Sequence, residues 1–185
     1  MTDFRDSLAS LRKLGPLLEE LADSPVEVHP DLFRDATVTE PRRHNPYHPV
    51  ERLIELHSDA DAVRGFDATT LTPGYDEAVY SQIESGMEVE VIYPSTVVEE
   101  LLARTDERGA ELIERENLTL RVYEDIPFGL TLCDDRLGIG CYDRETGMLE
   151  YYVDTDAPEA LAWGEEVFER YWQRSRPLDD DGTDG

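Results

Sequence analysis

Few residues in this sequence have the types and spacing that catalysis or metal binding requires. His44 and His48 are four positions apart, which on a helix would place two metal ligands on one face. Pro46 and Pro49 prevent a regular helix across this segment, and no cysteine or acidic cluster completes a ligand set. The sequence therefore predicts no metal site and no bound cofactor.

Motifs for phosphate binding and for acid–base catalysis are also missing. The Gly-Ile-Gly run at residues 138–140 falls in a predicted antiparallel strand and lacks the helix that would follow a phosphate-binding loop. Asp134 and Asp135 are typical of a two-residue hairpin turn, which explains them better than a catalytic pair of carboxylates. We therefore expect a protein that is not an enzyme, and a hydrolase is the weaker alternative.

A ligand-binding rim is predicted where the strands of a parallel sheet end. Ligands of open parallel sheets bind beyond the carboxyl ends of the strands, where helix N-termini present N–H groups. Two arginines and a histidine near the end of the first predicted strand offer positive charge for an anionic metabolite. The residues expected at this rim are Arg42, Arg43, His44, Asp67, Thr69, Tyr93, Ser95 and Glu124. For each of them, ordinary loop chemistry or helix capping is the alternative interpretation.

A group of aromatic residues near the C-terminus is a second candidate surface. Its members are Tyr151, Tyr152, Trp163, Tyr171 and Trp172. They could form a shelf for a ligand, but aromatic residues at strand and helix spacing usually belong to the core. We therefore expect core packing for this group.

The elements that would hold the rim alternate along the first two thirds of the chain. Apolar runs predict strands at residues 36–39, 61–67, 87–93 and 118–123, with helical periodicity in the segments between them. This alternation predicts a largely parallel sheet with right-handed crossovers. At the start of one helix, Thr96 and Glu99 match a capping box, in which two side chains satisfy free N–H groups reciprocally.

After residue 124 the pattern changes to strands that are joined by short turns. Phe128–Cys133, Arg136–Tyr142 and Met148–Val153 are three such strands, and they predict an antiparallel meander. A final helix opens near Pro158, and Pro177 ends it. The fold class expected is therefore α/β, with a helix-flanked mixed sheet that is parallel in its first half and antiparallel in its second.

The first residues show apolar side chains at steps of three and four, which place them on one helical face. This face comprises Phe4, Leu8, Leu11, Leu14, Leu18 and Leu21. Gly15 and Pro16 interrupt it and predict a kink or two consecutive helices. The face either packs on the domain's own core or forms a linker or dimerisation helix.

The net charge limits the partners of the chain. It is -26, from 43 acidic and 17 basic residues, and Lys13 is the one lysine. Such a surface stays hydrated in molar salt, where the Debye length is about 3 Å, so it predicts a halophilic protein. The sequence has no cluster of Lys and Arg for duplex DNA, no apolar run near the roughly 20 residues of a membrane span, and no signal peptide. We expect a cytoplasmic protein with Cys133 and Cys141 reduced.

Two segments carry a resemblance to a known family. Residues 124–178 contain Pro-Phe-Gly-Leu, then an Asp-Asp-Arg turn, and later Pro-Glu-Ala followed by a tryptophan near the start of the last helix. Residues 45–66 contain Asn-Pro-Tyr-His-Pro-Val-Glu-Arg-Leu and end in Val-Arg-Gly-Phe. The chain thereby resembles the C-terminal part of haloarchaeal helix-turn-helix transcription regulators, similar to the methanogenesis-regulator and TrmB-type sugar-sensing groups.

The resemblance implies a phospholipase D-like fold that senses a ligand and forms dimers, connected to DNA through an N-terminal winged helix. Catalytic proteins of that fold need a histidine and a lysine two residues later. The residue two positions before Lys13 is Leu11, so the resemblance implies a non-catalytic domain. No helix-turn-helix precedes the effector region, so contact with DNA is expected to be indirect.

We therefore expect the signal-sensing and dimerisation domain of an archaeal transcription regulator. Residues 1–23 are expected as the linker or dimerisation region, 24–178 as the effector domain and 179–185 as a disordered acidic tail. Its expected partners are a small-molecule effector and a second copy of the chain, with no membrane. The alternative is a stand-alone small-molecule-binding or protein-interaction domain without a role in DNA binding.

Overall fold

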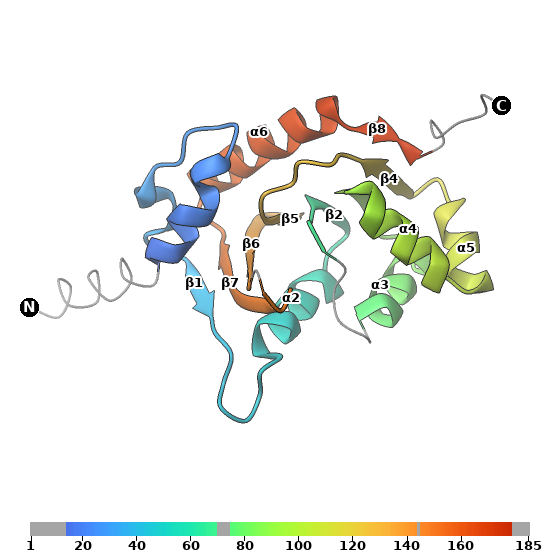
Figure 1. Ribbon diagram of the computed structural model, residues 1–185, viewed down its shortest axis with the longest axis horizontal. Helices are drawn as coiled ribbons and strands as arrows, with labels where there is room; N and C mark the ends of the chain where they lie inside the picture. Colours follow the sequence, from blue (N-terminus) through green and yellow to red (C-terminus); the bar gives the residue numbers. More distant parts are fainter. Residues whose placement is uncertain (1–13, 70–74, 144, 179–185) are drawn as a thin grey trace, which may run out of the picture.

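An eight-stranded mixed sheet runs through the molecule and has helices on both of its faces (Figure 1). The computed structural model describes residues 14–69, 75–143 and 145–178. The strands are β1 (Thr37–Thr39), β2 (Ala62–Phe66), β3 (Glu88–Tyr93), β4 (Leu118–Val122), β5 (Gly129–Cys133), β6 (Arg136–Tyr142), β7 (Leu149–Thr155) and β8 (Arg176–Pro177). The helices are α2 (His48–Ser58), α3 (Tyr75–Glu84), α4 (Ser95–Arg104), α5 (Glu107–Ile113) and α6 (Pro158–Arg174), with short 3-10 helices η1 (Leu21–Asp23) and η2 (Pro30–Phe33).

The sheet has a parallel half and an antiparallel half, and they meet at β2. The strand order is β1-β7-β6-β5-β2-β3-β4-β8. β3 lies between β2 and β4 and is parallel to both. On the other side of β2, the strands β5, β6 and β7 follow as antiparallel neighbours. The predicted parallel half and the predicted meander are therefore confirmed.

The first strand, predicted at residues 36–39 as part of the parallel half, does not join that half, so its predicted place is wrong. β1 pairs antiparallel with β7, with Val38 opposite Val153, so it lies at the far edge of the meander and outside the parallel half. Hydrophobic alternation predicts that a segment is a strand, but it carries no information about which edge the strand joins. The partner of β1 comes more than a hundred residues later in the chain.

One face of the sheet carries the main hydrophobic core, beneath α6. Trp163, Val167 and Tyr171 recur every four residues along α6 and are all buried against the sheet. Ile139 of β6 lies in the same core, and Phe33 of η2 packs edge-on against Trp163 with 5.8 Å between ring centroids. Each such buried side chain contributes about 1.5–3 kcal/mol of hydrophobic stabilisation.

The opposite face is covered by α2, α3 and α5. Side chains of a strand point alternately to the two faces, so Phe66 of β2 lies in the main core whereas Val63 packs with Ile83 and Leu112 in a second core. Leu53 of α2 joins Tyr152 of β7 in a third, smaller cluster. The candidate site lies between the sheet and the helices on this face.

The two ends of the described chain both pack on the sheet. Leu14, Leu17 and Leu21 are buried in the main core, so residues 14–21 are attached to the domain. Residues 14–20 are helical through Gly15 and Pro16, and the earlier positions of the predicted apolar face lie outside the described residues, as does the predicted tail. After α6, β8 pairs with β4 and completes the sheet. Within the described ranges, every helix is too short or too polar to cross a membrane.

Candidate ligand-binding cavity

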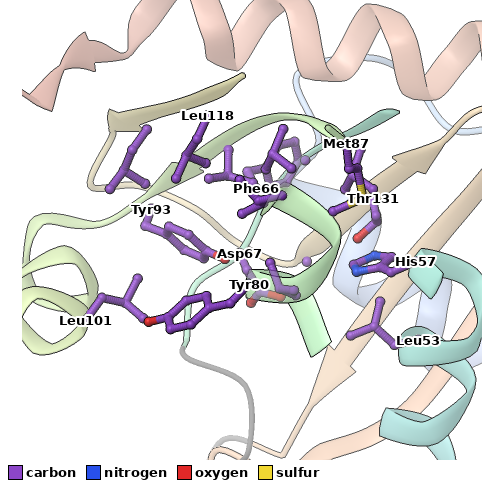
Figure 2. A pocket seen from close by; sticks show the side chains of 18 of the residues that line it. Leu53, His57, Phe66, Asp67, Tyr80, Met87, Tyr93, Leu101, Leu118 and Thr131 are labelled. Carbon is purple, nitrogen blue, oxygen red and sulfur yellow. The ribbon is translucent and has the colours of Figure 1, made fainter. Parts of the chain in front are cut away.

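A cavity of about 150 Å³ lies between the sheet and helices α2 to α5, beside the carboxyl ends of β2 and β3 (Figure 2). Strands β2 to β7 contribute lining residues on one side, and helices α2 to α5 contribute most of the others. Most of the lining is apolar. The ionisable lining residues are His57, Asp67, Tyr80, Tyr93, Tyr142 and Tyr152. Neither lysine nor arginine is found among the described residues that line it.

Asp67 is the one carboxylic acid among the described lining residues. It follows β2 directly, and its backbone N–H donates to the carbonyl of Ile92 in β3 at 3.2 Å. The Tyr142 hydroxyl donates to Oδ2 of Asp67 at 2.5 Å, and the Thr69 backbone N–H donates to Oδ1 at 3.2 Å. Burial raises the pKa of Asp67 to about 7, although these hydrogen bonds favour the charged form. Near neutral pH the carboxyl group is therefore divided between its two protonation states.

A glycine in β5 leaves room for the carboxyl group of Asp67. Gly129 pairs with Gly140 of β6, next to the end of β2. A Cβ atom at position 129 would lie 2.8 Å from Oδ2 of Asp67 and 3.3 Å from the ring of Tyr142. Such a contact is too short to be tolerated without a shift. Glycine at position 129 therefore allows the carboxyl group of Asp67 to occupy this position.

The remaining polar groups reach the cavity from several elements. His57 comes from α2 and is 6% exposed, and burial lowers its pKa to about 4, so its imidazole is neutral at pH 7. Tyr80 of α3 and Tyr93 at the end of β3 project toward the same space as Asp67 (Figure 2). Tyr152 of β7 is fully buried, and burial holds its pKa well above the ordinary value. These phenols and the imidazole are uncharged hydrogen-bonding groups in an apolar surrounding.

The structure brings part of the predicted rim to the cavity. Asp67 and Tyr93 line it, and Thr69 contacts Asp67 through its backbone. Ser95 and Glu124 meet each other instead, because the Ser95 N–H donates to both carboxylate oxygens of Glu124 at 3.3 Å. Glu124 thereby satisfies the first turn of α4. The predicted capping box is wrong, since this helix starts at Ser95 after Pro94 and has no side-chain cap from Thr96.

The three predicted cations of the rim lie elsewhere. Arg42, Arg43 and His44 form an exposed turn before α2, in which the backbones of Arg42 and Asn45 exchange hydrogen bonds of 2.9 Å. None of the three is among the described lining residues. Tyr142, which ends β6, and His57 of α2 were not among the residues predicted from the sequence.

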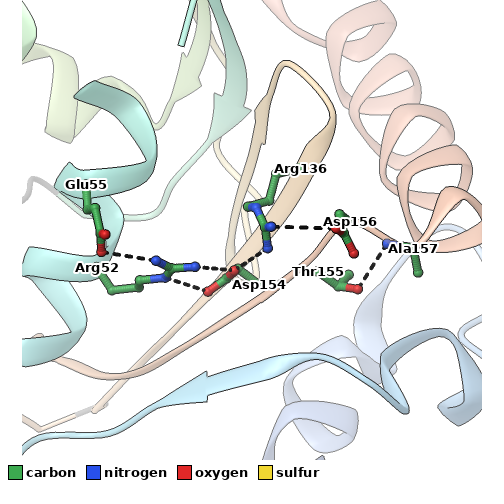
Figure 3. A network of polar contacts seen from close by, with 7 residues as sticks. All are labelled: Arg52, Glu55, Arg136, Asp154, Thr155, Asp156 and Ala157. Atoms are coloured by element: carbon green, nitrogen blue, oxygen red, sulfur yellow. Dashed lines mark hydrogen bonds and ion pairs between the residues drawn. The ribbon is translucent and has the colours of Figure 1, made fainter. Parts of the chain in front are cut away.

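A second polar cluster lies at the other side of α2 (Figure 3). Asp154 of β7 is completely buried and accepts hydrogen bonds from Arg52 of α2, with Nε at 3.0 Å and Nη2 at 2.9 Å. Arg136 of β6 donates to the same carboxylate at 2.8 Å. Arg52 also pairs with Glu55, and Arg136 lies 3.7 Å from Asp156. Because every partner is supplied by the chain itself, this cluster ties α2 to the meander.

The described residues offer no alternative chemistry for a metal or a reactive thiol. No three His, Cys, Asp or Glu side chains gather there in a way that would hold a metal ion. Cys133 and Cys141 are free and buried, and they belong to different cores on opposite faces of the sheet. Burial raises the pKa of both thiols to about 12, so they stay protonated.

This sheet, with helices on both faces and a cavity at the junction of its halves, has the phospholipase D-like fold. Nuc from Salmonella typhimurium, a phospholipase D family member, matches with a TM-score of 0.56 at 12% identity, over 78% of this chain and 97% of its own. NucT from Helicobacter pylori matches with a TM-score of 0.61 at 12% identity, over 78% of this chain and 99% of its own. TrmBL2, described as an archaeal chromatin protein with a novel mode of DNA binding, has a TM-score of 0.61 at 15% identity, over 96% of this chain and 66% of its own.

Sequence comparison gives the family. The family described as methanogenesis regulatory protein FilR1, middle domain, matches residues 46–174, and the chain belongs to it. The methanogenesis regulatory protein FilR1 of Methanothrix harundinacea (strain 6Ac) is 30% identical over 147 residues, which is 74% of this chain and 32% of the relative. The chain thus spans about a third of that relative's length. The resemblance to this regulator group is confirmed.

Proposed function

We propose that this chain is the signal-sensing domain of an archaeal transcription regulator and that its signal is a small molecule held in the cavity. The observation that carries the proposal is the cavity itself, a mainly apolar space with a few converging polar groups at the junction of the two halves of the sheet. Membership of a regulatory-protein family supports a regulatory use of this space.

We propose further that the site recognises its ligand without turning it over. The catalytic arrangement of this fold needs a histidine with a lysine two residues later, and Lys13 is preceded at that spacing by Leu11. In the described lining, the one histidine is buried and neutral, and lysine is absent. The polar groups that remain suit hydrogen bonding to a bound molecule.

A ligand in this space would contact both halves of the sheet at once. Asp67 follows β2 and Tyr93 ends β3 in the parallel half, whereas Gly129 and Tyr142 belong to the meander. A ligand that binds one arrangement of these halves better than another shifts the population toward it. We propose that a DNA-binding segment outside this chain reads that shift, and that the chain acts as a homodimer.

A ligand screen with a blocked cavity tests the sensing role. The Val79→Trp variant fills the cavity from α3, and Ala103→Trp adds the same side chain at an exposed position of α4 that does not line it. Thermal unfolding would be followed in molar KCl against a broad panel of small molecules. A true ligand at about 100 times its Kd stabilises wild type and Ala103→Trp by about 2.7 kcal/mol, and Val79→Trp much less. Ligand shifts that persist in Val79→Trp, or a panel without any stabilising compound, would count against the proposal.

The homodimer is tested separately by size-exclusion chromatography with light scattering at high salt. A dimer mass at tens of micromolar protein is expected. A strict monomer at that concentration would rule out dimerisation of this chain by itself and would leave the ligand test unaffected.

A further inference from the structure

The chemistry of the cavity points to one class of ligand. We propose, on the basis of the function above, that the cavity binds a small cation: a protonated or alkylated amine on an apolar body. Asp67 is its counterion, and tyrosine rings surround its charge. Three independent features of the structure carry this assignment.

The first feature is the sign of the charges around the cavity. Its described lining has one acid and no lysine or arginine, so an anionic ligand would meet only a like charge. One guanidinium beside a lining residue, that of Arg108, lies 5.9 Å from the centroid of the Tyr80 ring. It is occupied by Glu84 at 2.6 Å and Glu77 at 2.7 Å, which leaves it little attraction for a further anion.

The second feature is the position of Asp67 without a cation. Its hydrogen bonds come from a neutral phenol and from backbone N–H groups, and no arginine or lysine of the described structure contributes to its electrostatic surroundings. Asp154, by contrast, has two arginines within 3.0 Å. A carboxylate that is taken out of water and given no positive partner is unstable in its charged form, and a cationic ligand removes that instability.

The third feature is the aromatic content and size of the space. Tyr80, Tyr93, Tyr142 and Tyr152 line it. The faces of such rings attract ammonium groups, and cages of this kind recognise alkylated amines. A cavity of about 150 Å³ accommodates a molecule of benzene size, so the apolar body has about six to eight non-hydrogen atoms.

The charge of the whole molecule acts in the same direction. With a net charge of -26, the protein attracts cations and repels anions at long range. This field would also attract amines weakly over the whole surface. Such surface binding must be distinguished from binding in the cavity. Molar KCl does so, because it shortens the Debye length to about 3 Å at the surface and screens buried groups much less.

Three probes of similar shape and different charge test the proposal. Cyclohexylammonium, cyclohexanol and cyclohexanecarboxylate would be titrated calorimetrically into the whole chain in molar KCl at pH 8. We expect cyclohexylammonium to bind at least tenfold more tightly than cyclohexanol, and cyclohexanecarboxylate to show no binding. In Asp67→Asn the preference for the ammonium over the alcohol should disappear. Asp135→Asn, which makes the same change in an exposed turn, should keep it.

The outcomes separate this proposal from the sensing role. If cyclohexanol binds wild type as tightly as cyclohexylammonium, or if Asp67→Asn keeps the preference, the ligand is not a cation and the cavity remains a ligand site. If none of the three probes binds wild type, the cation proposal is overturned, and the panel screen with Val79→Trp decides the sensing role by itself. The wild-type comparison needs no substitution, so it holds even if Asp67→Asn fails to fold.

Discussion

Two aspartates that are removed from water, Asp154 and Asp67, have opposite electrostatic surroundings. Asp154 is completely buried, and Arg52 and Arg136 neutralise it at 2.8–3.0 Å. Asp67 receives a phenol hydrogen bond from Tyr142 and faces a cavity. The same type of side chain therefore links α2 to the meander where the chain supplies its counterion, and under our proposal it binds a ligand where the described residues supply no counterion.

The two carboxylates differ in the free energy that their removal from water costs the folded state. Two arginines offset the loss of water around Asp154, and the arginines are themselves partly exposed, at 25% and 30% of their side chains. No arginine or lysine of the described structure offsets the loss of water around Asp67, and its hydrogen bonds do so only in part, so its pKa is raised. Five substitutions test whether the presence or absence of a counterion accounts for this difference.

Removing the charge of Asp154 should be the most damaging change. Asp154→Asn leaves Arg52 and Arg136 without their shared carboxylate, and breaking one side of a buried ion pair costs about 3–5 kcal/mol. Chemical denaturation in molar KCl would measure the loss. The exposed change Asp135→Asn should stay within about 0.5 kcal/mol of wild type. If Asp154→Asn lowered the free energy of unfolding by less than about 1 kcal/mol, the cluster would contribute little to holding α2 on the meander.

Removing the charge of Asp67 should instead stabilise the folded protein. Its folded pKa of about 7 lies above the ordinary 3.8, so between about pH 4 and 7 the folded state holds the extra proton. Stability contributed by this proton falls as pH rises through that window and is gone above pH 7. Since one pKa unit corresponds to about 1.4 kcal/mol, Asp67→Asn should be on the order of 1–3 kcal/mol more stable than wild type at pH 8.

Denaturation of wild type and Asp67→Asn at a series of pH values would measure this difference. Taking the difference between the two proteins cancels the contribution of His57, whose lowered pKa makes stability fall as pH drops from about 6.5 to 4. A difference that does not depend on pH would mean that Asp67 is ionised in the folded protein at all these values.

Adding one carbon atom beside Asp67 should also destabilise the folded protein. In Gly129→Ala the new Cβ would start 2.8 Å from Oδ2 of Asp67, and such overpacking costs about 1–3 kcal/mol. Gly15→Ala is the matched control, because its Cβ meets nothing within 4 Å and lies in a helix, so a gain of about 0.5–1 kcal/mol is expected. Equal effects of the two changes in thermal unfolding would contradict the close approach at Gly129.

The Tyr142 hydroxyl should have a smaller effect. Tyr142→Phe removes one hydrogen bond to Asp67 and should cost about 1 kcal/mol below pH 7. The lost donor favoured the charged carboxylate, so the pKa of Asp67 should rise further, which an NMR titration of the carboxyl carbon would detect. An unchanged pKa would show that the phenol does not hold this carboxylate.

The exposed end of the second polar cluster should matter least. Asp156 is 76% exposed and 3.7 Å from Arg136, and exposed ion pairs contribute about 0–1 kcal/mol. Asp156→Asn should therefore be indistinguishable from wild type in molar KCl and slightly destabilised at low salt. If it were as damaging as Asp154→Asn, burial would not be what separates the members of this cluster.

Local patterns in the sequence were sufficient for most of the elements. Strands β2 to β7 and the helices between them follow from apolar periodicity, because each is long enough to show its period. The position of β1 did not follow, since its pairing with β7 depends on a contact between distant segments. The cap of α4 failed for the same reason: Glu124 from another segment meets its first turn, and the local Thr96 pattern is not used.

The site was predictable only where it obeys a rule about strand ends. Asp67 and Tyr93 were predicted because they stand at the carboxyl ends of parallel strands, where such sheets bind ligands, and both line the cavity. Tyr142 is 75 residues from Asp67, and Arg52 is 102 residues from Asp154. Pairings over such separations are decided by the packing of whole elements, and a single sequence does not display them.

The short edges of the sheet have a consequence for association. The edge strands β1 and β8 are three and two residues long. An edge of that length presents few open N–H and C=O groups, so another polypeptide finds little template on which to add a strand. These two strands therefore offer a second polypeptide less to pair with than the helices and loops offer it to pack against.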